Sequence, residues 1–580
     1  MRLNPRDVTG ITAVSMCSSA SWFSRIFFAI SLTISPSSAA VPQTAGEESN
    51  AAEKLVVARA TAGKIADLTK EKDRKLSAHF LEALLTGALP DFKPHRNGVQ
   101  IVGAVIDEPI SLRNAQISFP VWLLRCQFNN SVTFEHATFA DAVSFSWSAF
   151  KAFAQFIQMK VGGDAVFSSA VFEEPAVFAR INIAGDFKAQ AAKFRDKEKA
   201  ATFNGMKVGG DARFDRTVFE GSADFSAADI DGNFEATEVH FNNQKEGAFF
   251  KDMKVRGDRA FFYAAVFEGP VYFGGADIAH DFSMLKASFN NEKETANFFR
   301  MKVGGDAIFN LTVFDGPVFF SEVSIANNFQ VGAKFNNQKN EAYFYRMKVA
   351  GYTFFDGSFQ GPVDLSQANF GSLDVSHAAW PKVRMQGMSY DYISAAQAEP
   401  DSHKKLLAVV NQSAYSGDVY RRLEEFFARQ GYRADADEAF IAGKRREREE
   451  LEPKPRESVL AYFRSGRWLR WLGSLTLDLL VGYGRRPWQA GIPCAVLVAL
   501  GCVLFSPKKM EPRNPAEAPR VYSRFWYSLG LFLPFVDLQA DKVWKPKADQ
   551  TFLRSYMRVH ILLGWILIPI VLAALTGLIK

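Results

Sequence analysis

The phrase Met-Lys-Val-Gly-Gly-Asp at residues 159–164 is the stretch that best predicts the fold of this chain of 580 residues. It returns unchanged at 206–211 and 301–306, with Arg256 in place of a glycine at 253–258, and in decayed form at 347–351. The steps between successive Met residues are 47, 47, 48 and 46 residues. A period this regular predicts a repeat architecture, in which each unit buries its apolar face only against its neighbours.

Phenylalanine marks a second, shorter period inside each repeat. The chain contains 54 Phe against 15 Tyr and 10 Trp, which indicates one structural position filled by Phe many times. A five-residue spacing departs from the 3.6-residue period of an α-helix. A small residue often stands two positions before the Phe, and the pairs at this spacing are Phe167 and Phe172, Phe214 and Phe219, Phe262 and Phe267, and Phe309 and Phe314.

This pattern of a small residue, a polar residue, a Phe or Leu and two more residues resembles the pentapeptide-repeat proteins over roughly residues 98–372. The resemblance implies a mainly β fold, a right-handed quadrilateral parallel β-helix with about four pentapeptides in each coil. It also implies that the Phe or Leu and the small residue point inward, where stacked rings add to the energy of burial. Some steps are six or four residues long, so we expect an imperfect helix.

The 47-residue unit then corresponds to two coils of about twenty residues plus a short exposed excursion. That excursion is a polar run rich in Asn and Lys at 242–245, 290–293 and 336–339, as suits an exposed turn. Gly-Pro dipeptides at 269–270, 316–317 and 361–362 indicate corners of the coil.

Two charged positions recur with the same long period. We interpret the acids as structural, each accepting backbone hydrogens at the turn after Gly-Gly; an acidic column that binds cations is the alternative. These acids are Asp164, Asp211, Asp258 and Asp306. The lysines are predicted to form a solvated stripe, and they are Lys160, Lys207, Lys254, Lys302 and Lys348.

The N-terminal part predicts export and a cap. Residues 1–40 are typical of a signal peptide, since an apolar run at 26–34 precedes a small-residue cleavage site at 38–40. An uncleaved anchor is the alternative. Residues 41–97 are predicted to be a linker followed by one or two amphipathic helices that cover the open end of the β-helix at 98–375.

The C-terminal part predicts a hairpin and a membrane tail. Residues 376–460 are predicted to hold a transition and a helical hairpin, whose basic run at 444–448 is either a solvated helix end or a contact for anionic lipid. The membrane region, 461–580, contains two predicted transmembrane helices at about 488–506 and 561–579. Neither apolar stretch carries an acid or a base, and a shorter apolar run at 525–538 is predicted to be interfacial or re-entrant.

The tail is similar to that of bacterial membrane-associated pentapeptide-repeat proteins, on the residues 480–488, 532–538 and 564–565. This resemblance implies a bacterial inner-membrane protein. A cleaved signal peptide places the β-helix in the periplasm, and the basic loop at 507–560 agrees with that orientation. The segment 440–486 is equally basic and favours the opposite orientation.

Catalytic and ligand-binding patterns are missing from the sequence. The eight histidines are scattered, the four cysteines form no CxxC, and neither HExxH nor a nucleophile elbow occurs. Gly-Gly-Asp is not a dinucleotide-binding fingerprint. We therefore predict no catalytic, cofactor-binding or metal-binding residues and no cofactor. A net charge of +6 is not a nucleic-acid signature, so no nucleic-acid partner is predicted.

These observations favour a non-catalytic, membrane-anchored β-helical scaffold that presents a repetitive surface for protein–protein interaction. Its predicted partners are the lipid bilayer and either another protein or a second copy of the chain. Two alternatives stay open: a two-helix membrane pore or transport-associated module, and an enzyme whose site is not visible in the sequence.

Overall fold

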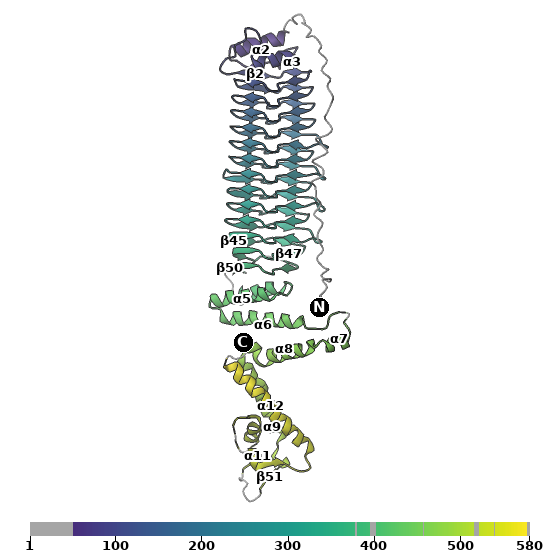
Figure 1. Ribbon diagram of the computed structural model, residues 1–580, viewed down its shortest axis with the longest axis vertical. Coiled ribbons are helices and arrows are strands. Elements are labelled where there is room, and N and C mark those ends of the chain that lie inside the picture. The colour runs from purple at the N-terminus through teal and green to yellow at the C-terminus, as the bar shows by residue number, and fades with distance from the viewer. Residues whose placement is uncertain are drawn as a thin grey trace, which may run out of the picture. The chain divides into compact units, whose positions relative to one another are not determined.

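The computed structural model describes residues 50–377, 380–394, 402–455, 457–514, 521–536, 538 and 540–576. The predicted signal peptide lies outside the described residues. The chain forms a parallel β-solenoid, with helices before it and after it, and Figure 1 shows its coils stacked one on another from β2 to β50. The predicted fold class, mainly β with helical ends, is confirmed.

Each coil contributes four short strands, one to each side of the solenoid. In one coil these are β13 (Lys160–Val161), β14 (Ala165–Val166), β15 (Val171–Phe172) and β16 (Ala176–Val177). The next coil starts at β17 (Asn182–Ile183), which pairs in parallel with β13. The sheet that contains β16 has thirteen strands, and these mark thirteen successive coils.

The long period is two coils, as predicted. Lys160 pairs with Asn182, which pairs with Lys207, so successive coils advance by 22 and then by 25 residues. The longer coil holds the polar excursion, which lies between one strand and the next at residues 195–200 in this pair of coils.

The six-residue steps are regular over most of the solenoid, but the expectation of an imperfect helix is confirmed near its end, where the pairing of β45 (Lys348–Phe355) with β48 (Asn369–Asp374) shifts register. Strand starts at 160, 165, 171, 176 and 182 alternate between five and six residues. The six-residue corners contain a residue in the left-handed region, such as Ser169 with φ 56° and Arg180 with φ 55°. The left-handed conformation costs an L-residue about 1–2 kcal/mol, so the coil pairing on both sides must hold each of these corners in place.

The core is a set of phenylalanine ladders. Phe178 stacks on Phe203 with ring centres 5.0 Å apart and planes within 3°, and Phe203 stacks on Phe225 at 4.8 Å. A second ladder on the neighbouring side stacks in the same way, for example Phe194 on Phe219 at 4.9 Å. The two ladders meet edge to face, as in the 87° contact between Phe194 and Phe203. The inward direction predicted for Phe is confirmed.

Helices cover the first coil, as predicted. The helices α2 (Ala51–Thr61) and α3 (Ala78–Thr86) lie before β2 (Val99–Val102) and belong to the same apolar core. The buried Glu53 side chain ties them together, because it accepts a hydrogen bond from the Ser77 backbone N–H at 3.0 Å. An open sheet edge is thereby closed.

A helical hairpin covers the other end. The helix α5 (Gly417–Arg429) packs on the last strand of the solenoid, β50 (Ser389–Ser394), through contacts of Phe426 with Tyr390 and Tyr392. The helices that follow are α6 (Arg433–Glu449), α7 (Val459–Arg464), α8 (Arg467–Val481), α9 (Gly491–Leu504), α10 (Arg524–Phe532) and α12 (Thr551–Leu575). The short helix α10 packs against both α9 and α12.

Two helical stretches are long and apolar enough to cross a membrane. They are Pro487–Leu504 and Thr551–Ala573, and only 17% of each is buried inside the protein. The second begins at Thr551 rather than at Ile561, so it includes Arg554, Arg558 and His560. These bases precede the predicted span at 561–579, which itself carries none.

Candidate functional site

The recurring acids form a hydrogen-bond ladder between coils. The Oδ1 atom of Asp164 accepts a hydrogen bond from the backbone N–H of Asp186 at 2.9 Å. In the same way, Asp186 Oδ1 accepts from the Asp211 N–H and Asp211 Oδ1 accepts from the Asn233 N–H, each at 2.9 Å. Asp306 accepts from Asn328 at 3.0 Å in the same way. The structural interpretation of Asp164, Asp211 and Asp306 is confirmed, although the donor belongs to the next coil rather than to the acid's own turn. Among the described residues the Asp258 side chain makes no such bond, and only its backbone oxygen accepts from Asp281.

The glycines before each acid allow the coils to approach. A Cβ atom on Gly162 would lie 2.2 Å from the backbone oxygen of Ala140, and one on Gly209 would lie 2.5 Å from that of Ala184. The recurring phrase is therefore a packing and hydrogen-bonding device. Among the described residues, no group of three or more His, Cys, Asp or Glu side chains is placed to hold a metal ion.

Three of the recurring lysines lie on the surface beside acids, whereas Lys160 pairs with Thr138 and Asn182, and Lys348 pairs with Ser324 and Asn369. Parallel pairing sets Lys207 next to Asp229, Asp229 next to Lys254, Lys254 next to Asp277 and Asp277 next to Lys302. Alternating charges on an exposed strand face match the solvated stripe that the sequence predicts.

One face of the solenoid carries a column of aromatic side chains, which we call the aromatic stripe. It consists of the outward-facing Phe249, Tyr272, Phe319 and Tyr343 on the thirteen-stranded sheet, with Asn297 between the second and third. All four aromatic side chains are half-buried. In the first six coils the same position holds Ser111, Thr133, Gln155, Val177, Thr202 and Asp224.

Cationic side chains border the aromatic stripe. Phe249 stacks on Tyr272 at 5.2 Å, and the Lys251 Nζ atom lies 4.7 Å from the centre of the Tyr272 ring. Phe319 stacks on Tyr343 at 4.8 Å. Two further rings at the following corner, Phe299 and Tyr345, each lie under an arginine, Arg300 at 4.8 Å and Arg346 at 5.0 Å.

The sequence contains a signal for the aromatic stripe, although the five-residue Phe period does not reveal it. Adjacent residues of a strand point to opposite sides, so a doublet such as Phe319-Phe320 or Tyr343-Phe344 places one ring inside and one outside. Such doublets begin at Phe249 and do not occur in the earlier strands of this sheet.

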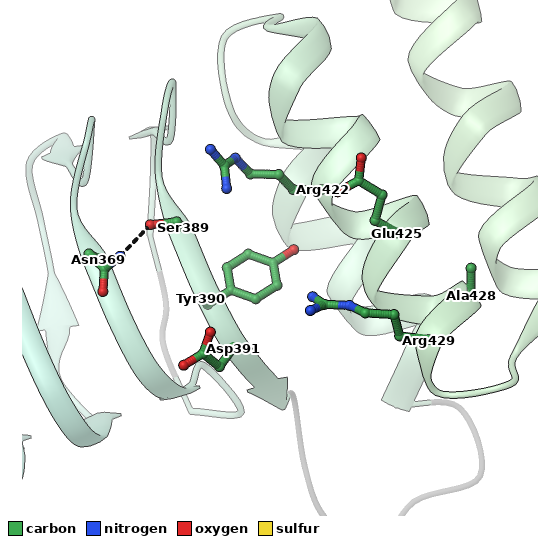
Figure 2. Close-up of a pocket in the computed structure, with 8 residues that line it drawn as sticks. All are labelled: Asn369, Ser389, Tyr390, Asp391, Arg422, Glu425, Ala428 and Arg429. Atoms are coloured by element: carbon green, nitrogen blue, oxygen red, sulfur yellow. Dashed lines mark hydrogen bonds between the residues drawn. The ribbon is translucent and has the colours of Figure 1, made fainter.

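A depression of about 580 Å³, open to solvent, lies between the last strands of the solenoid and the second half of α5. Figure 2 shows Tyr390 directed from β50 toward α5, with Arg422 on one side of the ring and Arg429 on the other. Asn369 donates a hydrogen bond to the Ser389 hydroxyl at 2.8 Å on the strand side. Burial raises the pKa of Tyr390, so its hydroxyl is neutral at physiological pH. The other lining residues are Asp391, Glu425 and Ala428.

An ionic joint connects the hairpin to the helix that precedes the membrane-length segments. The nearly buried Asp478 of α8 accepts hydrogen bonds from Arg445 and Arg448 of α6, with Arg445 Nη2 and Arg448 Nη1 each 2.9 Å from a carboxylate oxygen. These two arginines belong to the basic run at 444–448, and both pair with Asp478, although the Arg445 side chain is still half-exposed. Arg485 adds a second ion pair to the hairpin, with Asp437 at 3.1 Å.

A buried histidine links the membrane-length helices. The His560 Nε2 atom on α12 lies 3.2 Å from the Ser528 hydroxyl on α10, and that hydroxyl donates to the backbone oxygen of Val498 on α9 at 2.9 Å. The Tyr556 hydroxyl lies 3.3 Å from the other ring nitrogen. These bonds satisfy His560 and join three helices.

No protein-family model, no curated protein and no solved structure matches this chain.

Substitutions at Asp211 separate the structural interpretation from cation binding. We expect Asp211→Ala to lower the free energy of unfolding by about 1–3 kcal/mol, because the Asn233 N–H loses its acceptor. Asp211→Asn keeps an oxygen in place and should cost less than half as much. Urea unfolding of the detergent-solubilised chain, followed by circular dichroism, measures both. Equal losses for the two variants would argue for a role of the charge instead.

The ionic joint should depend on charge and on pH. Burial raises the pKa of the Asp478 carboxyl, but the hydrogen bonds from Arg445 and Arg448 outweigh burial and hold it below its ordinary value. Because the folded-state pKa is lowered, the stabilisation is complete above the ordinary Asp pKa of about 3.9 and is lost as the pH falls through the lowered value. The joint should thus persist in mild acid.

Removing the charge at neutral pH should open the same joint. We expect Asp478→Asn to weaken the contact between α6 and α8 by roughly 3 kcal/mol, since two arginines lose a nearly buried partner. Faster amide hydrogen exchange in both helices measures this. The control is Glu447→Gln, which removes an exposed pair with Lys444 in the same basic run and should change exchange little. Similar exchange in the two variants would contradict the assignment.

Proposed function

We propose that this chain is a membrane-anchored pentapeptide-repeat scaffold that binds another protein along its aromatic stripe. The coils of four strands, with inward Phe and small residues, support the proposed membership of that family. A β-solenoid built in this way is a repetitive module that needs no catalytic centre.

The observation that carries the proposal is the aromatic stripe with its bordering cations. Protein interfaces are enriched in Tyr, Phe and Arg, and a few such residues supply most of the binding energy. The stripe offers half-exposed rings on a rigid sheet, with Arg300 and Arg346 beside it. Side chains held by a solenoid lose little conformational freedom when a partner docks.

The two membrane-length helices support anchoring to a bilayer. Burial inside the protein accounts for only 17% of each, so an apolar surface is left for lipid. The exposed apolar side chains of α7 and α8, among them Leu460, Phe463, Leu469 and Leu472, suit a position at the membrane interface. We place the anchor in the bacterial inner membrane and the solenoid in the periplasm.

Replacing rings of the stripe should abolish partner binding without unfolding the solenoid. The variant Phe249→Thr with Tyr272→Thr introduces the residue that earlier coils carry at this position, as at Thr133 and Thr202. Loss of hot-spot residues should reduce cross-linked partner in native membranes about tenfold or more. Mass spectrometry of the cross-linked products identifies the partner, and a second copy of the chain would appear as a homodimer.

The matched control changes the same sheet elsewhere. Thr133→Ala with Thr202→Ala should leave cross-linking at the wild-type level, because these coils lie outside the stripe. Unchanged cross-linking after loss of the rings, or no partner above background with the wild-type chain, would contradict the scaffold.

A reporter fusion tests the proposed compartment. Alkaline phosphatase, which is active only outside the cytoplasm, is fused after residue 460, between the hairpin and the membrane region. The periplasmic placement predicts high activity in whole cells. A cytoplasmic reporter that is active at the same junction would reverse the orientation.

A further inference from the structure

We propose that the cavity between β50 and α5 binds a small organic anion, whose phosphate or carboxylate group is held by Arg422, Arg429 and the hydroxyl of Tyr390. The cavity goes beyond the scaffold function, because it lies at the end of the solenoid and shares no residue with the aromatic stripe. Binding of an anion here does not depend on protein binding at the aromatic stripe.

The donors that converge here have no partner of their own. The Arg422 Nε atom is buried and makes no hydrogen bond within the described part of the chain. Neither Arg429 nor the Tyr390 hydroxyl has a hydrogen bond or an ion pair to another described residue. A buried donor left unsatisfied costs about 1–3 kcal/mol, so an acceptor from a ligand would relieve this cost at Arg422 Nε, whereas Arg429 is exposed to solvent.

The charge balance of the cavity favours an anion. Glu425 lines the cavity, but it pairs with Arg421 on the same helix at 3.4 Å. The unpaired charges are then the two guanidinium groups, Arg422 and Arg429, against the one exposed carboxylate of Asp391. Guanidinium groups bind planar carboxylates and phosphates through paired, charge-assisted hydrogen bonds.

The helix places both arginines on one side. Arg422 and Arg429 are seven residues apart, which is two turns of α5 and about 10 Å along its axis. Figure 2 shows Tyr390 reaching into the interval between them. An anion beside the Tyr390 hydroxyl can receive hydrogen bonds from the phenol and from a guanidinium group that flanks it.

The size of the cavity indicates more than an inorganic ion. The depression of about 580 Å³ is open to solvent and has room for an organic body beside the charged group. The strand side offers the Ser389 hydroxyl and the Asn369 amide, which suit a polar, hydroxyl-bearing body. The ligand class is therefore a small phosphorylated or carboxylated metabolite.

Protection from an arginine reagent tests the site in the full-length protein. Phenylglyoxal modifies exposed guanidinium groups, and mass spectrometry reports the rate at each arginine. The probes are sodium phosphate, glucose 6-phosphate and sodium succinate, compared with sodium chloride at equal ionic strength to remove general screening. We expect about tenfold slower modification at Arg422 and Arg429, with Arg421 and Arg433 of the same hairpin unaffected.

The arms of the experiment distinguish the two anion chemistries. Protection by glucose 6-phosphate and phosphate identifies a phosphate site, and protection by succinate identifies a carboxylate site. No probe protecting beyond chloride, or equal protection at Arg421 and Arg433, would overturn the proposal. These modification rates are measured on the wild-type chain, so they do not depend on whether a variant folds.

A variant completes the test. Arg429→Gln should weaken the affinity for the protecting probe about tenfold and abolish the rise in melting temperature that the probe gives. The matched control is Arg433→Gln, which removes an exposed arginine just beyond the hairpin turn and should leave both unchanged. Equal effects of the two variants would assign the protection to general charge.

Discussion

Parallel hydrogen bonding between successive coils is the constraint on which the rest of this structure depends. Neighbouring strands in a sheet lie about 4.8 Å apart, and the same interval separates the rings of Phe203 and Phe225. A planar ring at each inward position therefore meets its equivalent at stacking distance without any adjustment. The spacing also forces the backbone of one coil close to the next, which explains why Gly162 and Gly209 carry no side chain.

The same constraint creates two open ends, and both are closed by helices. The helices α2 and α3 complete the core at the first coil, and α5 completes it at β50. Closing the second end has a chemical consequence, because a helix rich in arginine meets the edge of a sheet there. The packing of Phe426 on Tyr390 leaves room beside it for Arg422 and Arg429, whose charges the solenoid does not neutralise.

The sequence predicts the repeat well and the sites poorly, for physical reasons. Periodicity is a local property, so the five-residue Phe spacing and the phrase at 159–164 are enough to predict inward rings and two coils per period. The cavity joins residues on β50 with residues on α5, and no local pattern brings Tyr390 to Arg429. The sequence predicts a transmembrane helix from about residue 561, whereas α12 begins at Thr551. The loss of charged residues shows where the helix surface becomes apolar and does not show where the helix begins.

The outward-facing residues of the thirteen-stranded sheet indicate that the fold does not require the aromatic stripe. Thirteen coils contribute equivalent strands to this sheet, and the register is the same throughout. The first six coils pair as well with Ser111, Thr133 or Asp224 facing outward as later coils do with Phe249 or Tyr343. If outward rings were needed to hold the coils together, they would be needed in every coil. Their confinement to one part of the face therefore points to a use outside the solenoid, which is what a docking surface provides.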